Sequence, residues 1–118
     1  MKKPLLVQNG KVERGTALAR ETGYPTVNIR FAAPDISGTF AGQVMVGDTE
    51  YRAAVYADQE RQVLEAHLFD FSGDLYGRQV TIVLLEKLAE AQGFHSTYGE
   101  RSFIDWAVAE VRKYFNRK

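Results

Sequence analysis

The chain has 118 residues, of which 45% are hydrophobic and 25% charged, as expected for one soluble globular domain over residues 1–118. It has no cysteine, which excludes disulfides, thiolate metal sites and a cysteine nucleophile. Fifteen basic residues balance fifteen acidic ones, whereas proteins that bind nucleic acid or membrane surfaces usually carry a basic excess, so neither partner is expected.

The N-terminal segment carries no recognisable export signal. Its apolar run, residues 5–7, is too short for the core of a signal peptide. No apolar stretch approaches the length that spans a membrane. We therefore expect a cytoplasmic protein, either a monomer or a fragment of a longer chain.

Short strands separated by turns are predicted over most of the chain. The first is expected at residues 5–12 and the second, after a long polar loop, at residues 26–31. Residues 40–46 and 51–55 flank a Gly-Asp pair at positions 47–48, which is the chemistry of a tight hairpin turn.

The most regular strand is predicted at residues 63–71. Period-two alternation divides it into two faces: Val63, Glu65, His67 and Phe69 on one, and Leu64, Ala66 and Leu68 on the other. A Ser-Gly-Asp turn at residues 72–74 follows, and residues 79–85, rich in β-branched side chains, predict a further strand.

The hydrophobic period changes near the C-terminus. Apolar residues there recur at helical spacing in two overlapping series: Phe103, Ala107, Val111, Tyr114 and Ile104, Val108, Val111, Phe115. Thr97 with Glu100 fits a capping box, and Ser96 is a rival cap. About six strands followed by one helix indicate a mainly β barrel or sandwich, with the helix packed across one opening.

Three segments contain residues that could carry chemistry. In the first, a loop running from residue 10 through Gly15 to Arg20 and Gly23 could present backbone N–H groups and an arginine to phosphates. By itself this segment fits a plain connecting loop with a solvated arginine better.

The second segment is Tyr-Pro-Thr-Val-Asn at residues 24–28. Thr26 and Asn28 are two residues apart, so both side chains leave the same face of an extended chain. A hydroxyl and an amide oxygen side by side are hard ligands that suit Mg²⁺. The plain alternative is a β-branched strand start with a surface asparagine.

The third segment contains Glu65, whose sequence neighbours are apolar. A partly desolvated carboxylate there would be a base able to accept a hydroxyl proton. The plain alternative is a glutamate on the solvated face of a strand, which is common.

Taken together and in order, these segments resemble the riboflavin kinase family. The family carries a Gly-rich stretch ending in G-F-P-T-A-N, a G-x-Y/F-A-G strand, an E-x-H-x-x-D-F strand, a D-L-Y-G turn and a C-terminal helix. The counterparts here are GYPTVN at residues 23–28, GTFAG at 38–42, EAHLFDF at 65–71 and DLYG at 74–77.

The resemblance implies a six-stranded antiparallel Greek-key barrel with one C-terminal α-helix. It also implies transfer of the ATP γ-phosphoryl group to the 5′-hydroxyl of riboflavin, which gives FMN. Thr26 would bind Mg²⁺ and phosphate beside Asn28, and Glu65 would take the hydroxyl proton. Gly15, Arg20 and Gly23 would lie along the nucleotide phosphates, and Phe94 and Phe103 would form the flavin side.

The sequence departs from the family pattern beside the implied substrates. Ala17 and Ala19 replace loop glycines, Leu18 replaces an arginine, and the L-R-x-E segment reads Leu-Ala-Glu-Ala at residues 88–91. Two other hypotheses therefore stay open: a non-catalytic flavin- or nucleotide-binding module built on the same barrel, and a structural domain that binds no small molecule.

Overall fold

The computed structural model describes residues 3–14, 26–91 and 97–117, with only the backbone described at 97–102. Six strands and one helix follow one another along these ranges: β1 (Leu6–Lys11), β2 (Thr26–Arg30), β3 (Gly38–Val46), β4 (Thr49–Asp58), β5 (Val63–Leu68), β6 (Gln79–Ala89) and α2 (Thr97–Asn116). The mainly β fold with a C-terminal helix is therefore confirmed.

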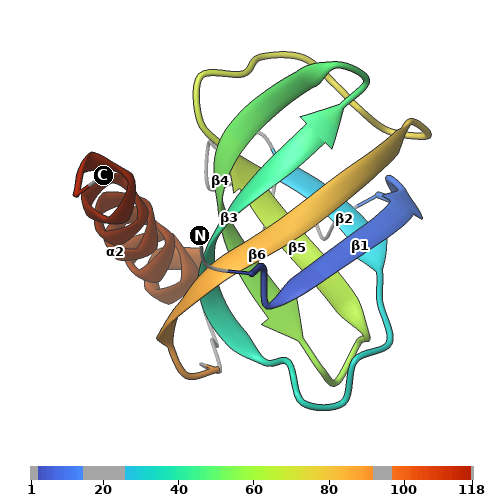
Figure 1. The fold of residues 1–118 in the computed structure, drawn as a ribbon. Helices are drawn as coiled ribbons and strands as arrows, with labels where there is room; N and C mark the ends of the chain where they lie inside the picture. The colour runs from blue at the N-terminus through green and yellow to red at the C-terminus, as the bar shows by residue number, and fades with distance from the viewer. Residues whose placement is uncertain (1–2, 15–25, 92–96, 118) are drawn as a thin grey trace.

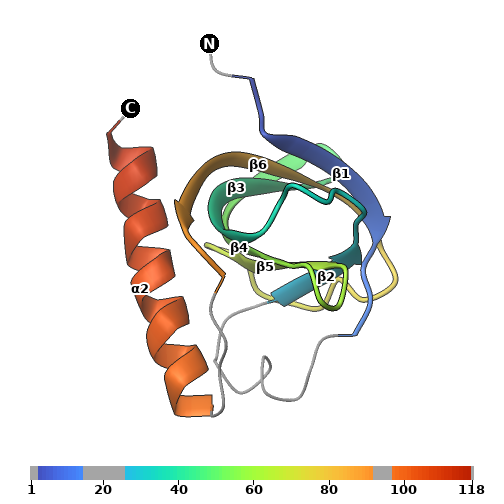
Figure 2. The same cartoon turned by 90° about the horizontal axis from the view of Figure 1, so that it is seen from below.

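The six strands form one antiparallel sheet in the order β1-β6-β3-β4-β5-β2. The sheet curls until its two edges approach each other (Figures 1 and 2). There the Glu13 N–H donates to the carbonyl oxygen of Asn28 at 2.7 Å. The neighbours β6-β3-β4-β5 follow the Greek-key order, because β3, β4 and β5 are consecutive and β6 returns beside β3.

Apolar side chains from all six strands fill the interior of the curled sheet. The fully buried members include Ile29 from β2, Phe40 from β3, Leu64 from β5 and Ile82 from β6. Because side chains alternate between faces, the residues on either side of these point to the outer wall. The packing of the interior therefore determines which side chains of β2 and β5 lie next to each other on the outer face of the sheet.

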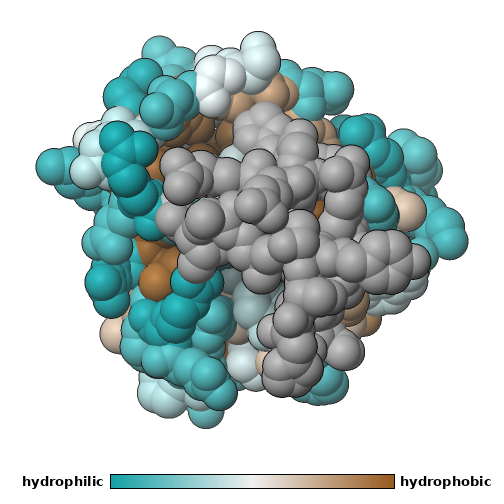
Figure 3. Space-filling view, turned by 180° about the vertical axis from the view of Figure 1, so that it is seen from behind, coloured by the Kyte–Doolittle hydropathy of each residue, from teal (hydrophilic) through white to brown (hydrophobic). Residues whose placement is uncertain are grey.

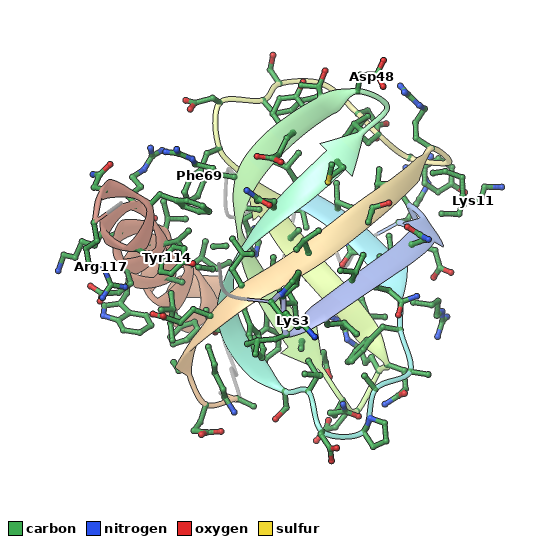
Figure 4. All side chains as sticks on the ribbon, viewed as in Figure 1. Lys3, Lys11, Asp48, Phe69, Tyr114 and Arg117 are labelled. Carbon is green, nitrogen blue, oxygen red and sulfur yellow. The ribbon has the colours of Figure 1, made fainter. Side chains whose placement is uncertain are left out.

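The helix α2 lies along the outer wall of the sheet, on β3, β4 and β6 (Figure 2). Its apolar stripe covers two alanines of the wall, Ala41 and Ala54. Phe69 and Tyr114 fill the space between sheet and helix (Figure 4). The prediction that the helix packs across a barrel opening is wrong, because the small alanines leave the wall flat enough to receive it.

Several strand ends differ from the predicted ones. β5 ends at Leu68 because Asp70 adopts a φ of 57°, which breaks the extended chain three residues before the predicted end. β6 continues to Ala89, where pairing with β3 holds it beyond residue 85. The predicted hairpin is confirmed: Val46 pairs with Thr49 across the turn, and Gly47 has a φ of 60°.

Gly38 starts β3 in a conformation that only glycine adopts easily. Its φ is 105°, and a Cβ atom there would collide with the carbonyl oxygen of Ala89 on β6. We therefore expect Gly38→Ala to lower the free energy of unfolding by about 2 kcal/mol, measured by urea denaturation. The control is Gly47→Ala, which has positive φ but no atom within 4 Å and should cost less. Equal losses in both variants would contradict the collision.

The described surface seen from behind is mostly hydrophilic, and apolar residues appear only in small areas between polar ones (Figure 3). Within the described ranges, no helix combines the length and apolar composition needed to span a bilayer.

Candidate active site

Two of the segments singled out in the sequence lie side by side as neighbouring strands. In the register of β2 and β5, Thr26 is opposite His67, and Asn28 is opposite Glu65. Directly opposite residues of an antiparallel pair share a face. The residue between Thr26 and Asn28 belongs to the interior core, so all four side chains lie on the outer face of the sheet.

This four-residue cluster of Thr26, Asn28, Glu65 and His67 is unusual because it is buried. Asn28 and Glu65 are each 5% exposed and His67 is 3% exposed, while Thr26 is half-buried. Charged residues are rarely so buried unless they are paired. The plain alternative of a solvated glutamate at position 65 is therefore wrong, because this side chain is buried.

His67 connects the two strands of the cluster. Its Nδ1 lies 3.4 Å from the hydroxyl oxygen of Thr26, and its Nε2 lies 3.5 Å from Oε1 of Glu65. The period-two alternation predicts that His67 shares a face with Glu65, but it indicates no role for the histidine. The sequence feature that could have suggested a role is the spacing: His67 is two residues after Glu65, so both side chains leave the same face of the strand and can contact each other.

The cluster continues sideways along the sheet as a row of cross-strand partners. Glu65 is opposite Tyr56 on β4, and Tyr56 is opposite Thr39 on β3. The outer face thus carries a polar row, Asn28-Glu65-Tyr56-Thr39, that crosses four strands. The adjacent row reads Thr26-His67-Ala54-Ala41, and α2 covers its two alanines.

The oxygen atoms of the cluster suit a hard divalent cation. Thr26 supplies a hydroxyl oxygen and Asn28 an amide oxygen, which are ligand types that Mg²⁺ takes together with water and phosphate. In the part of the chain that the structure describes, no group of three or more His, Cys, Asp or Glu side chains gathers as a metal site. Two protein oxygens would leave the other positions of such a cation to water and phosphate oxygens.

Of the other site residues predicted from the sequence, the structure describes only Phe103. Gly15, Arg20, Gly23 and Phe94 lie outside the described residues, as does the rival helix cap at position 96. Phe103 lies near the start of α2, partly exposed, with its ring centroid 5.4 Å from that of Trp106.

Comparison with known proteins gives one family. The family model described as flavokinase, riboflavin kinase, matches residues 3–115. The bifunctional riboflavin kinase/FMN adenylyltransferase of Pseudomonas fluorescens is 35% identical over 116 residues, covering 87% of this chain and 36% of the relative. The protein with the same description from Escherichia coli (strain K12) is 34% identical, with 91% and 37% covered. The chain thus spans little more than a third of the length of these relatives.

Solved structures share the fold, and two of them illustrate it. A riboflavin kinase from Trypanosoma brucei superimposes with a TM-score of 0.65 at 23% identity, covering 93% of this chain and 76% of that one. A Streptococcus pneumoniae chain described as a macrolide-efflux protein gives a TM-score of 0.72 at 23% identity, covering 92% and 37%. At this level of identity the likeness concerns the architecture of the barrel and helix.

Proposed function

The chain belongs to the riboflavin kinase family, and on that premise we propose that it transfers the γ-phosphoryl group of ATP to the 5′-hydroxyl of riboflavin, giving FMN and ADP. The observation that supports this best is the buried pairing of Asn28 with Glu65 on the outer face of the sheet. That pairing puts a candidate base beside a candidate metal ligand, which phosphoryl transfer requires.

Glu65 is the proposed general base. As the ribityl 5′-oxygen forms its bond to the γ-phosphorus, the bond from that phosphorus to the β-phosphate bridging oxygen breaks. The hydroxyl proton passes to the Glu65 carboxylate, and ADP leaves with the electrons of the broken bond. Its burial leaves the carboxylate little exposed to water, which would otherwise compete with the acceptor hydroxyl for it.

Thr26 and Asn28 are the proposed protein ligands of Mg²⁺. When bound, the metal would neutralise the charge of the phosphate oxygens and hold the donor in line with the acceptor. Gly15, Arg20 and Gly23 remain proposed phosphate contacts, and Phe94 and Phe103 remain proposed contacts on the flavin side.

His67 is a proposed positioning residue, because its two ring nitrogens face the Thr26 hydroxyl and the Glu65 carboxylate. We expect His67→Ala to lower kcat about tenfold while leaving KM for riboflavin within twofold, since it loosens the base without touching the flavin. The effect should largely disappear in a Glu65→Gln background, which a double-mutant cycle measures. Full additivity of the two changes would contradict this role.

The altered residues Ala17, Ala19 and Ala89 favour one second candidate, a flavin- or nucleotide-binding module without catalysis. Incubation with riboflavin, ATP and Mg²⁺, followed by chromatography for FMN, separates the two. Metal-dependent FMN formation supports the kinase. Quenching of riboflavin fluorescence without any FMN supports the binding module and rejects the kinase.

A further inference from the structure

Thr39, near the start of β3, has a buried hydroxyl oxygen that makes no hydrogen bond within the described part of the chain. The residue is 2% exposed, and its hydroxyl is the buried side-chain oxygen without a hydrogen-bond partner in the described part of the chain. Buried polar groups are normally paired, since an unpaired one carries the cost of its lost hydration. A valine would fill the same space without that cost, so the hydroxyl calls for an explanation.

The residues before and after Thr39 in the chain determine which way its side chain points. Phe40, the next residue, is 2% exposed and packs in the interior core, so Thr39 must face the outer wall. Gly38, the preceding residue, lies close against the Ala89 carbonyl. Thr39 also pairs with Ala89, whose methyl side chain offers no hydrogen-bonding group.

Thr39 is part of the polar row that contains Glu65. It is opposite Tyr56 on β4, which is opposite Glu65 on β5. Neighbouring strands lie about 4.8 Å apart, so Thr39 is two strands, or about 10 Å, from the proposed base. An unpaired hydroxyl at this distance on the same face would meet a second part of an acceptor bound at Glu65 once that acceptor displaces the atoms that cover it.

We propose that Thr39 is a specificity-determining residue, whose hydroxyl hydrogen-bonds riboflavin where the ribityl chain joins the ring system. From the 5′-oxygen to the ring nitrogen the chain has six single bonds of about 1.5 Å, which span roughly 7–8 Å when extended. A flavin with its 5′-hydroxyl at Glu65 and its chain along the row therefore brings the chain's last hydroxyl and the adjacent ring edge to Thr39. The threonine hydroxyl both donates and accepts, so it suits either group.

This inference rests on the proposed function. It is tested with Thr39→Val, which keeps the shape and removes the hydroxyl, and with Thr39→Ser, which keeps the hydroxyl. We expect Thr39→Val to raise both the Kd for riboflavin, from fluorescence quenching, and its KM by about 5- to 10-fold. KM for ATP should stay unchanged, and Thr39→Ser should keep the riboflavin constants close to those of the unaltered protein.

The melting temperature without ligand shows whether a change in riboflavin binding comes from a loss of folding stability. Without ligand, Thr39→Val should melt at the same temperature as the unaltered protein or higher, because it removes an unpaired buried oxygen. Thr49→Val, at an exposed position at the start of β4, is the control and should change none of the riboflavin constants.

The outcomes distinguish this inference from the function on which it rests. FMN formation with unchanged Kd and KM in Thr39→Val would overturn the role of Thr39 and leave the kinase standing. Riboflavin binding that Thr39→Val weakens, in a protein that makes no FMN, would support the contact and reject the kinase. A protein that neither binds riboflavin nor phosphorylates it would overturn both.

Discussion

The variant Glu65→Gln is expected to form FMN about 100- to 10,000-fold more slowly than the unaltered protein, the range that a positioned general base contributes. Glutamine has nearly the shape of glutamate and keeps an oxygen for the contact that Glu65 makes with His67 at 3.5 Å. It cannot take the proton of the 5′-hydroxyl. The loss should therefore appear in kcat, with the Kd for riboflavin little changed.

The rate is measured by chromatography of FMN at saturating riboflavin, ATP and Mg²⁺, with the Kd from fluorescence quenching. Glu50→Gln makes the same chemical change at an exposed position of β4 and should retain full activity. A Glu65→Gln variant that keeps more than a tenth of the activity would remove Glu65 from its role as base.

Thr26→Val is expected to raise the Mg²⁺ concentration for half-maximal activity by on the order of 10- to 100-fold. Valine keeps the β-branched shape at the start of β2 but removes the hydroxyl oxygen, whose contact with a charged group contributes about 1.5–3 kcal/mol. Raising the Mg²⁺ concentration should recover part of the activity, because Asn28 and the ATP phosphates still bind the metal.

The Mg²⁺ titration of FMN formation is compared with that of Thr26→Ser, which keeps a hydroxyl and should need close to the original concentration. Thermal unfolding without ligand checks that Thr26→Val still folds, since Thr26 is only half-buried. An unchanged Mg²⁺ requirement in Thr26→Val would show that this hydroxyl does not hold the metal.

Most of the fold follows from local patterns in the sequence. The alternation around Leu64 and Leu68 predicts two faces for β5, and the structure places Leu64, Ala66 and Leu68 together in the interior core. Glycine at position 47 predicts the β3–β4 turn, and the change of period near Phe103 predicts α2. These signals are readable because a strand, a turn and a helix each impose a periodicity or a backbone angle over a few residues.

Such local patterns did not predict where the helix packs, nor which residues of different strands form the polar row. An apolar stripe shows that α2 must pack, but several surfaces could accept it. The outer wall was decided by Ala41 and Ala54, which come from different strands. Likewise, nothing in the residues beside Thr39 indicates that its hydroxyl stays unpaired, since that depends on Tyr56 and Ala89 across the sheet.

The sequence by itself determined the kind of groups available: a hydroxyl and an amide two residues apart in one segment, and a glutamate and a histidine two residues apart in another. Only the tertiary structure decided that Thr26 meets His67 across 41 residues of chain, in a register that also pairs Asn28 with Glu65. The physical reason is that a one-residue slip in strand pairing would turn one pair of side chains into the core, and only the packing of the whole barrel selects the register.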